Sequence, residues 1–141
     1  LYYQTYGISV NDYGAIWSNN TNTGITLGTL STSDIVCFAW DGVNQALYVR
    51  KNGDAWINSG DPTSGASKTG AVKTFTGTRT MFPAVGDQSG AHAVGTSTNF
   101  GNGYFGTTAI SSEGTNASGI GKFEYDVPTG YTALSTKGLN E

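Results

Sequence analysis

The sequence predicts an all-β domain in which two antiparallel sheets pack face to face as a sandwich. The chain has 21 glycines among 141 residues and is rich in threonine, and most stretches long enough for a helix contain a glycine or proline. Short apolar runs instead alternate with turn residues about every 8–12 positions, which is typical of sandwich strands. Aromatic residues make up 12% of the chain, so apolar surface for a core is present.

The composition excludes several classes of protein. A length of 141 residues suits a single domain over residues 1–141. Charged residues are only 12%, with a net charge of −3, and the seven Lys and Arg are scattered along the chain. Nucleic-acid binding needs clustered positive charge, and no apolar run has the length of a membrane span. We expect neither nucleic acid nor a membrane as a partner, and no motif indicates a cofactor.

The first strands are expected at Leu1–Tyr6 and Gly14–Trp17, followed by a polar loop at Asn19–Gly24. Leu1 reads as the middle of a strand, and the last residues carry no stop signal. We therefore expect the chain to be an excerpt of a longer polypeptide.

A three-stranded meander is the strongest local prediction. Asp34–Asp41 is apolar on both faces, as in a strand covered on both sides. Gly42–Asn44 supplies a turn, and Gln45–Lys51 returns as the second strand. Asn52–Gly53 is a residue pair favoured in tight hairpin turns with positive φ, and Asp54–Asn58 follows as the third strand.

The rest of the chain alternates loops with weaker strands. Polar loops are expected at Ser59–Gly70 and at Gly106–Gly121, the second of low complexity. Further strands or anchoring segments are expected at Thr80–Val85, where Pro83 favours an edge or bulge, and at Ala91–Phe100, Phe123–Val127 and Tyr131–Leu134.

Cys37 is the single cysteine and lies inside the apolar run of the meander. Free cysteine in such a run usually behaves as a small hydrophobe, so we expect a packed thiol and no nucleophile. A lone reduced cysteine suits a particle assembled inside a cell.

Five short motifs occur in one order along the chain. They are Asp34-Ile-Val-Cys-Phe-Ala-Trp-Asp41, Lys51-Asn52-Gly53, Phe82-Pro83-Ala84-Val85, Asn99-Phe100-Gly101 and Pro128-Thr-Gly-Tyr-Thr-Ala-Leu134. In this order they resemble SPRY-type, concanavalin-like β-sandwich domains, and in particular those of tail and capsid-associated proteins of bacteriophages.

The resemblance implies a virion protein, assembled in the host cytoplasm, such as a tail fibre, baseplate or capsid-decorating protein. Its partners would be other virion subunits, with a homo-oligomer expected and a trimer if the protein is a fibre. Two departures stand out: Gly106–Gly121 is an insertion, and the N-terminal strands of the family are missing before Leu1. Either more chain precedes Leu1 or another chain covers the sheet edge that this leaves open.

Catalytic candidates are weak. Glu124 and Asp126 would share one face of a strand, roughly 7 Å apart, where some sandwich glycoside hydrolases carry paired carboxylates, but a solvated strand face is favoured. His92 is the single histidine, and no nucleophile elbow accompanies it. We expect no enzymatic activity, and a glycan-degrading enzyme is the least favoured of the hypotheses.

Metal and phosphate sites are also weak. One cysteine and one histidine cannot build a zinc site. A calcium site from Asp54, Asn58 and Asp61 would use hard oxygen ligands, but no loop shows a dense pattern of acids. Gly101–Gly106 resembles a phosphate loop only in its glycines, which are interpreted as turn residues.

Recognition through polar loops is therefore the favoured function, with a structural contact between virion subunits or binding of a host receptor or glycan as the possibilities. The loops expected to bind are Asn19–Gly24, Ser59–Gly70, Asp87–Ala91 and Gly106–Gly121. The binding candidates are Asn20, Asn22, Asp61, Ser64, Gln88, Tyr104, Phe105 and Asn116. Tyr104 and Phe105 are the aromatic rings most suited to stacking on a ligand.

Overall fold

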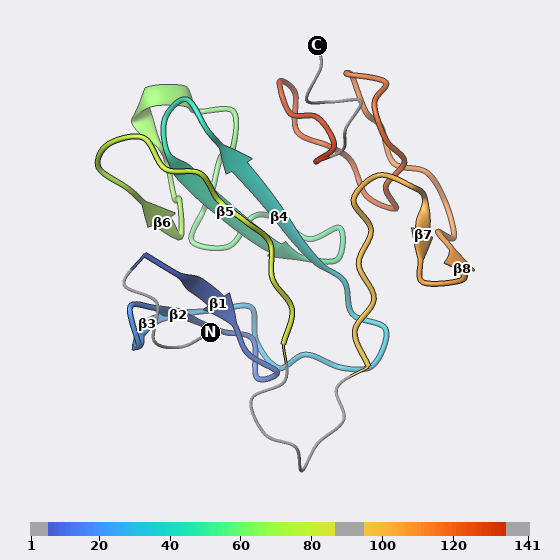
Figure 1. Cartoon of the computed structure of the whole chain (residues 1–141), viewed down its shortest axis with the longest axis horizontal. Helices are drawn as coiled ribbons and strands as arrows, with labels where there is room; N and C mark the ends of the chain where they lie inside the picture. Colours follow the sequence, from blue (N-terminus) through green and yellow to red (C-terminus); the bar gives the residue numbers. More distant parts are fainter. Residues whose placement is uncertain (1–5, 87–94, 135–141) are drawn as a thin grey trace. The chain divides into compact units, whose positions relative to one another are not determined.

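The computed structural model describes residues 6–86 and 95–134, and the strands within them form three small antiparallel sheets (Figure 1). No α-helix occurs in these two ranges, which confirms the all-β prediction. The chain divides into two compact units, Leu1–Gln88 and Ser89–Glu141. The expected single domain over 1–141 stays a prediction.

The first sheet contains β1 (Ile8–Val10), β2 (Ala15–Ser18) and β3 (Thr21–Thr26) in that order. Asn19 and Asn20 form the turn between β2 and β3, and both have positive φ, as a two-residue hairpin turn needs. The prediction of a polar loop over 19–24 is therefore correct for the turn residues 19–20 and wrong for residues 21–24, which belong to β3. Threonine favours strands, and β3 is polar because most of it is exposed.

The second sheet contains β4 (Val36–Asp41), β5 (Ala46–Lys51) and β6 (Lys73–Thr74). The β4–β5 hairpin and its intervening turn confirm the first two strands of the predicted meander.

The third strand, predicted over 54–58, is absent, and β6 pairs with β5 in its place. The Asp54 N–H bonds back to the Lys51 carbonyl, and the chain turns out of the sheet. Trp56 then lies against the Arg50 guanidinium, 4.7 Å from the ring centroid. The segment thus contacts β5 through this ring and through one backbone bond, from the Ile57 N–H to the Val49 carbonyl, without forming a strand.

Three other predicted strands are also absent from the described residues. No strand occurs over 80–85 or 123–127, and none occurs over 95–100, the described part of the strand predicted from Ala91. Pro83 cannot donate to a ladder, and Phe82 leaves 82% of its surface exposed. The carbonyl of Phe123 accepts the Gly114 N–H within an irregular connection. Residues 91–94 of the strand predicted at 91–100 lie outside the described residues, as do residues 1–5 of the strand predicted at 1–6.

The core of the N-terminal unit combines side chains from both of its sheets. Buried Ile16 of β2 belongs to one cluster with Leu47 and Val49 of β5, together with Leu27 and Val72. Burial of side chains of this size contributes about 1.5–3 kcal/mol each. The opposite face of β5 holds Tyr48, which is almost fully buried.

The C-terminal unit is built from tight turns around one short hairpin, β7 (Tyr104–Phe105) with β8 (Thr108–Ala109). Gly101 and Gly121 approach so closely that an added Cβ on Gly121 would lie 3.0 Å from the Gly101 Cα and 2.6 Å from the Ala133 Cβ. Ile120 is buried in the same unit. The segment expected as a surface insertion, 106–121, therefore supplies β8 and a buried side chain to this unit.

Candidate functional site

The β7–β8 hairpin presents the Tyr104 ring at the surface of the C-terminal unit. The ring belongs to a residue that is 48% exposed. The Tyr104 N–H donates to the Asn102 side-chain oxygen at 3.1 Å, and the Ile110 N–H donates to the Gly103 carbonyl at 3.0 Å. The Ile110–Gly103 bond joins the two sides of the hairpin, and the Tyr104–Asn102 bond closes a local turn just before the ring.

An open hollow of about 470 Å³ lies beside this ring, within the size range of small-ligand sites. Its lining includes Asn102, Tyr104, Ile110, Ser112, Glu113 and Lys122. Lys122 Nζ lies 3.4 Å from a Glu113 carboxylate oxygen, and both side chains are about half exposed or more. The wall thus combines an aromatic face with an amide, a hydroxyl and a solvated ion pair of no net charge.

Asn99 organises the backbone below the hollow. Its side-chain oxygen accepts the Gly101 N–H at 2.7 Å and the Gly103 N–H at 3.3 Å, and its Nδ2 donates to the Lys122 carbonyl at 3.0 Å. One side chain therefore links the segment that carries Tyr104 to the segment that carries Lys122. Asn99 belongs to one of the five sequence motifs, but this role could not be predicted from the motif, because Lys122 is distant along the chain.

The other binding candidates in this unit are placed differently. Phe105 is half-buried. Asn116 donates from Nδ2 to the carbonyls of Ile120 and Gly121 and accepts from the N–H and hydroxyl of Ser118. The side chain of Asn116 thus shapes its own loop, and of the three candidates in this unit Tyr104 is the one that lines the hollow.

The candidates in the N-terminal unit form local turns. Asp61 Oδ1 accepts the N–H and hydroxyl of Thr63, and Ser64 Oγ donates to the Asp61 carbonyl and accepts the Thr69 N–H. Asn22 Oδ1 accepts the Gly24 N–H.

Asn20 is exposed in the β2–β3 turn. Gln88 and the whole of the loop predicted over 87–91 lie outside the described residues. The described candidates of the N-terminal unit do not line the hollow beside Tyr104.

Glu124 and Asp126 are each used to hold a neighbouring segment. Glu124 accepts the Ser111 hydroxyl at 2.6 Å and the Ser111 N–H at 3.2 Å. Asp126 Oδ1 accepts the Thr115 N–H at 2.7 Å and the Thr115 hydroxyl at 2.8 Å. These bonds replace the predicted solvated strand face, since no strand forms here. His92 lies outside the described residues.

The calcium candidates are likewise engaged in turns. Asn58 Nδ2 donates to the Gly70 carbonyl, and Asp61 closes its own turn. Within 6–86 and 95–134, no three His, Cys, Asp or Glu side chains cluster as a metal site would require.

Cys37 is a half-buried free thiol that lies 3.7 Å from the Asn52 carbonyl oxygen. Burial raises the pKa of this thiol and outweighs the opposing effect of the Arg50 guanidinium. A thiol with a raised pKa is a poor nucleophile at neutral pH, in keeping with the predicted packing role.

Comparison with protein-family models, with curated proteins and with solved structures finds no match for this chain. No helix in the described part of the chain is long and apolar enough to cross a membrane.

Proposed function

We propose that this chain is a non-catalytic recognition module of a bacteriophage virion protein, and that it binds a host-surface glycan at the hollow beside Tyr104. The observation that carries the proposal is one partly exposed aromatic ring beside polar side chains on a backbone held by hydrogen bonds. Sugar rings have apolar C–H faces and hydroxyl edges, so they need an aromatic surface and nearby hydrogen-bonding groups together.

The polar groups of the wall match hydroxyl chemistry. Asn102 and Ser112 are neutral, and the Glu113–Lys122 pair offers acceptors and donors without net charge. A surface ion pair of this kind contributes about 0–1 kcal/mol to stability, so its atoms can reorient toward a ligand at little cost. This balance favours a neutral glycan.

Two features support a binding module without catalysis. The Glu124 and Asp126 carboxylates each accept two hydrogen bonds from a serine or threonine of the 111–115 segment. Neither carboxylate lines the hollow beside Tyr104, whereas the two carboxyl groups of a glycoside hydrolase must flank the bond that is cleaved.

The virion assignment and the SPRY-type sandwich are supported by the order of the five motifs and by the low charge of the surface. A shared core is also expected of a sandwich, and β2 and β5, from different sheets, contribute to one cluster. Other virion subunits are the proposed structural partners.

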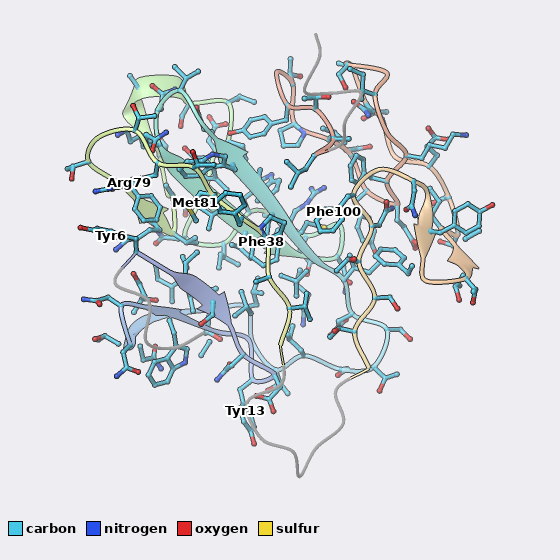
Figure 2. All side chains as sticks on the ribbon, in the orientation of Figure 1. Tyr6, Tyr13, Phe38, Arg79, Met81 and Phe100 are labelled. Carbon is cyan, nitrogen blue, oxygen red and sulfur yellow. The ribbon has the colours of Figure 1, made fainter. Side chains whose placement is uncertain are left out.

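The test uses the purified chain on a printed array of bacterial surface polysaccharides. The variant Tyr104→Ala removes the ring, and Tyr104→Phe keeps it without the hydroxyl. Tyr13→Ala is the matched control, because Tyr13 is 70% exposed and lies in the N-terminal unit (Figure 2).

We expect wild type, Tyr104→Phe and Tyr13→Ala to bind. We expect Tyr104→Ala to lose about tenfold or more in affinity, and a tenfold loss corresponds to about 1.4 kcal/mol of binding free energy. Circular dichroism confirms folding of each variant. A folded Tyr104→Ala that binds as wild type, or a wild type that binds no glycan, would contradict the proposal.

A further inference from the structure

Strand β4 lies at an edge of its sheet. The order of that sheet is β4-β5-β6, so β5 occupies one side of β4 and no described residue pairs with the other. An unpaired strand side presents N–H and C=O groups that can accept a further strand.

The register identifies which backbone groups face outward. Phe38 lies opposite Val49, and Trp40 lies opposite Leu47. The carbonyls of Val49 and Leu47 accept hydrogen bonds from residues outside β4, so both are directed away from it. In an antiparallel pair, when one of two opposite residues directs its N–H and C=O away from the other strand, the opposite residue does the same. Val36, Phe38 and Trp40 therefore direct their N–H and C=O groups to the open side.

This edge lacks the usual protection against pairing. Residues 36–40 are Val-Cys-Phe-Ala-Trp, with no charge, glycine or proline. The β4–β5 register runs without a bulge, and Phe38 is 57% exposed at the centre of the strand (Figure 2). Exposed apolar edges of this kind are normally blocked by lysine, proline or a bulge.

We propose that β4 pairs antiparallel with β4 of a second copy of this chain, with Phe38 at the two-fold axis. In this register Val36 lies opposite Trp40 of the second copy, and Phe38 lies opposite Phe38. Every outward N–H of one strand then meets an outward C=O of the other, because the three outward positions are symmetric about Phe38.

The side chains favour this occupant over an unrelated peptide. On one face of the paired strands, Val36 meets Trp40 and the two Phe38 rings meet at the axis. Cross-strand pairs of aromatic and β-branched side chains of this kind stabilise a sheet. On the other face Cys37 lies opposite Ala39, so small residues meet small ones. Asp41 falls opposite Ile35, so no two charges of the same sign are directly opposed. A shift of the register by one residue would place the outward N–H and C=O groups of one strand opposite residues whose own groups point away, so the hydrogen bonds could not form.

Sedimentation equilibrium of the whole chain over a concentration series tests the pairing. Wild type is expected to dimerise, and Phe38→Lys to weaken the dimer by about tenfold or more, because like charges meet at the axis and the aromatic pair is lost. Val43→Lys is the control, since Val43 is exposed in the β4–β5 turn, away from the edge groups.

A charge exchange tests the register itself. Phe38→Lys and Phe38→Glu are each expected to be monomers at concentrations where wild type is a dimer, and their equimolar mixture is expected to form a heterodimer. A wild type that stays monomeric at every concentration would overturn the proposal. Dimerisation unaffected by Phe38→Lys, or no heterodimer in the mixture, would also overturn it. Glycan binding by a monomer is compatible with either result.

Discussion

Amide side chains do much of the structural organisation at the residue scale. Gln45 is only 7% exposed and donates from Nε2 to the Gly42 carbonyl at 2.6 Å, while its side-chain oxygen accepts the Arg79 N–H. It therefore connects the β4–β5 turn to a segment 34 positions away. Buried polar groups are costly unless they are paired, so such a residue stabilises one arrangement of the chain.

The substitution Gln45→Leu keeps a similar volume but removes both hydrogen bonds. We expect a loss of about 1–3 kcal/mol in the free energy of unfolding, because the Arg79 N–H is left without its acceptor. Thr32→Ala, at an exposed turn position, is the control and should stay within about 0.5 kcal/mol. Urea unfolding of both variants measures the difference. Equal stabilities would show that Gln45 is not a structural link.

Asp34 predicts a pH dependence. Hydrogen bonds from the Asn52 side chain and then from the Ser31 N–H lower its pKa, and the charge of Lys51 acts in the same direction. A carboxyl with a lowered folded-state pKa stabilises the fold fully above its unfolded pKa of about 3.9. That contribution is lost as the pH falls through the folded-state value.

Asp34→Asn should therefore lose less stability than wild type when the pH is lowered from about 6 to about 2, across the unfolded pKa. Thermal unfolding at a series of pH values measures the slope. Thr32→Ala, at an exposed turn position, changes no titratable group and should retain the wild-type slope. A wild-type slope in Asp34→Asn would refute the assignment of this effect to Asp34.

At the element scale, the β4–β5 hairpin, whose strands are close in the sequence, was predicted, whereas strand β6, which depends on a distant partner, was not. The β4–β5 hairpin follows from an apolar run, a turn and a second run within one short stretch. Asn52–Gly53 was predicted as a tight hairpin turn with positive φ: Asn52 has a φ of 52°, but Gly53 is not among the glycines with positive φ, and no strand follows at 54–58. Strand β6 has only two residues, and its place depends on pairing with β5 from far along the chain. No period within residues 73–74 distinguishes such a strand from a loop.

The same difference explains the candidate site. Tyr104 was predicted from its aromatic character beside glycines, and it lines the hollow. Lys122 and Glu113 were not predicted, because their place in the wall depends on contacts between separate turns. Among these is the approach of Gly101 to Gly121.

Gly121→Ala tests this close approach. Gly121 and Gly130 both have positive φ, so alanine at either position costs about 1–2 kcal/mol from the left-handed conformation. An added Cβ at Gly130 meets no atom within 4 Å, whereas at Gly121 it meets Ala133 at 2.6 Å. We expect Gly121→Ala to be destabilised further, by about 1–3 kcal/mol beyond Gly130→Ala. Equal thermal stabilities of the two variants would contradict this packing.

At the scale of the whole molecule, the two surfaces proposed here belong to different units. The hollow beside Tyr104 belongs to the C-terminal unit, and the β4 edge belongs to the N-terminal unit. Two copies joined through β4 would carry two glycan sites, and paired sites raise the strength of binding to a repetitive polysaccharide through effective concentration. All-β character was predictable from short apolar runs separated by turn residues, but the identities of the proposed glycan and partner subunits depend on chemistry outside this chain.

An amide chemical-shift titration with the polysaccharide that gives the strongest array signal locates the bound glycan on the chain. The shifts are expected to concentrate at residues 102–104, 110–113 and 122, and to vanish in Tyr104→Ala. Shifts centred on the 61–69 loop, or none in the C-terminal unit, would contradict the proposed site.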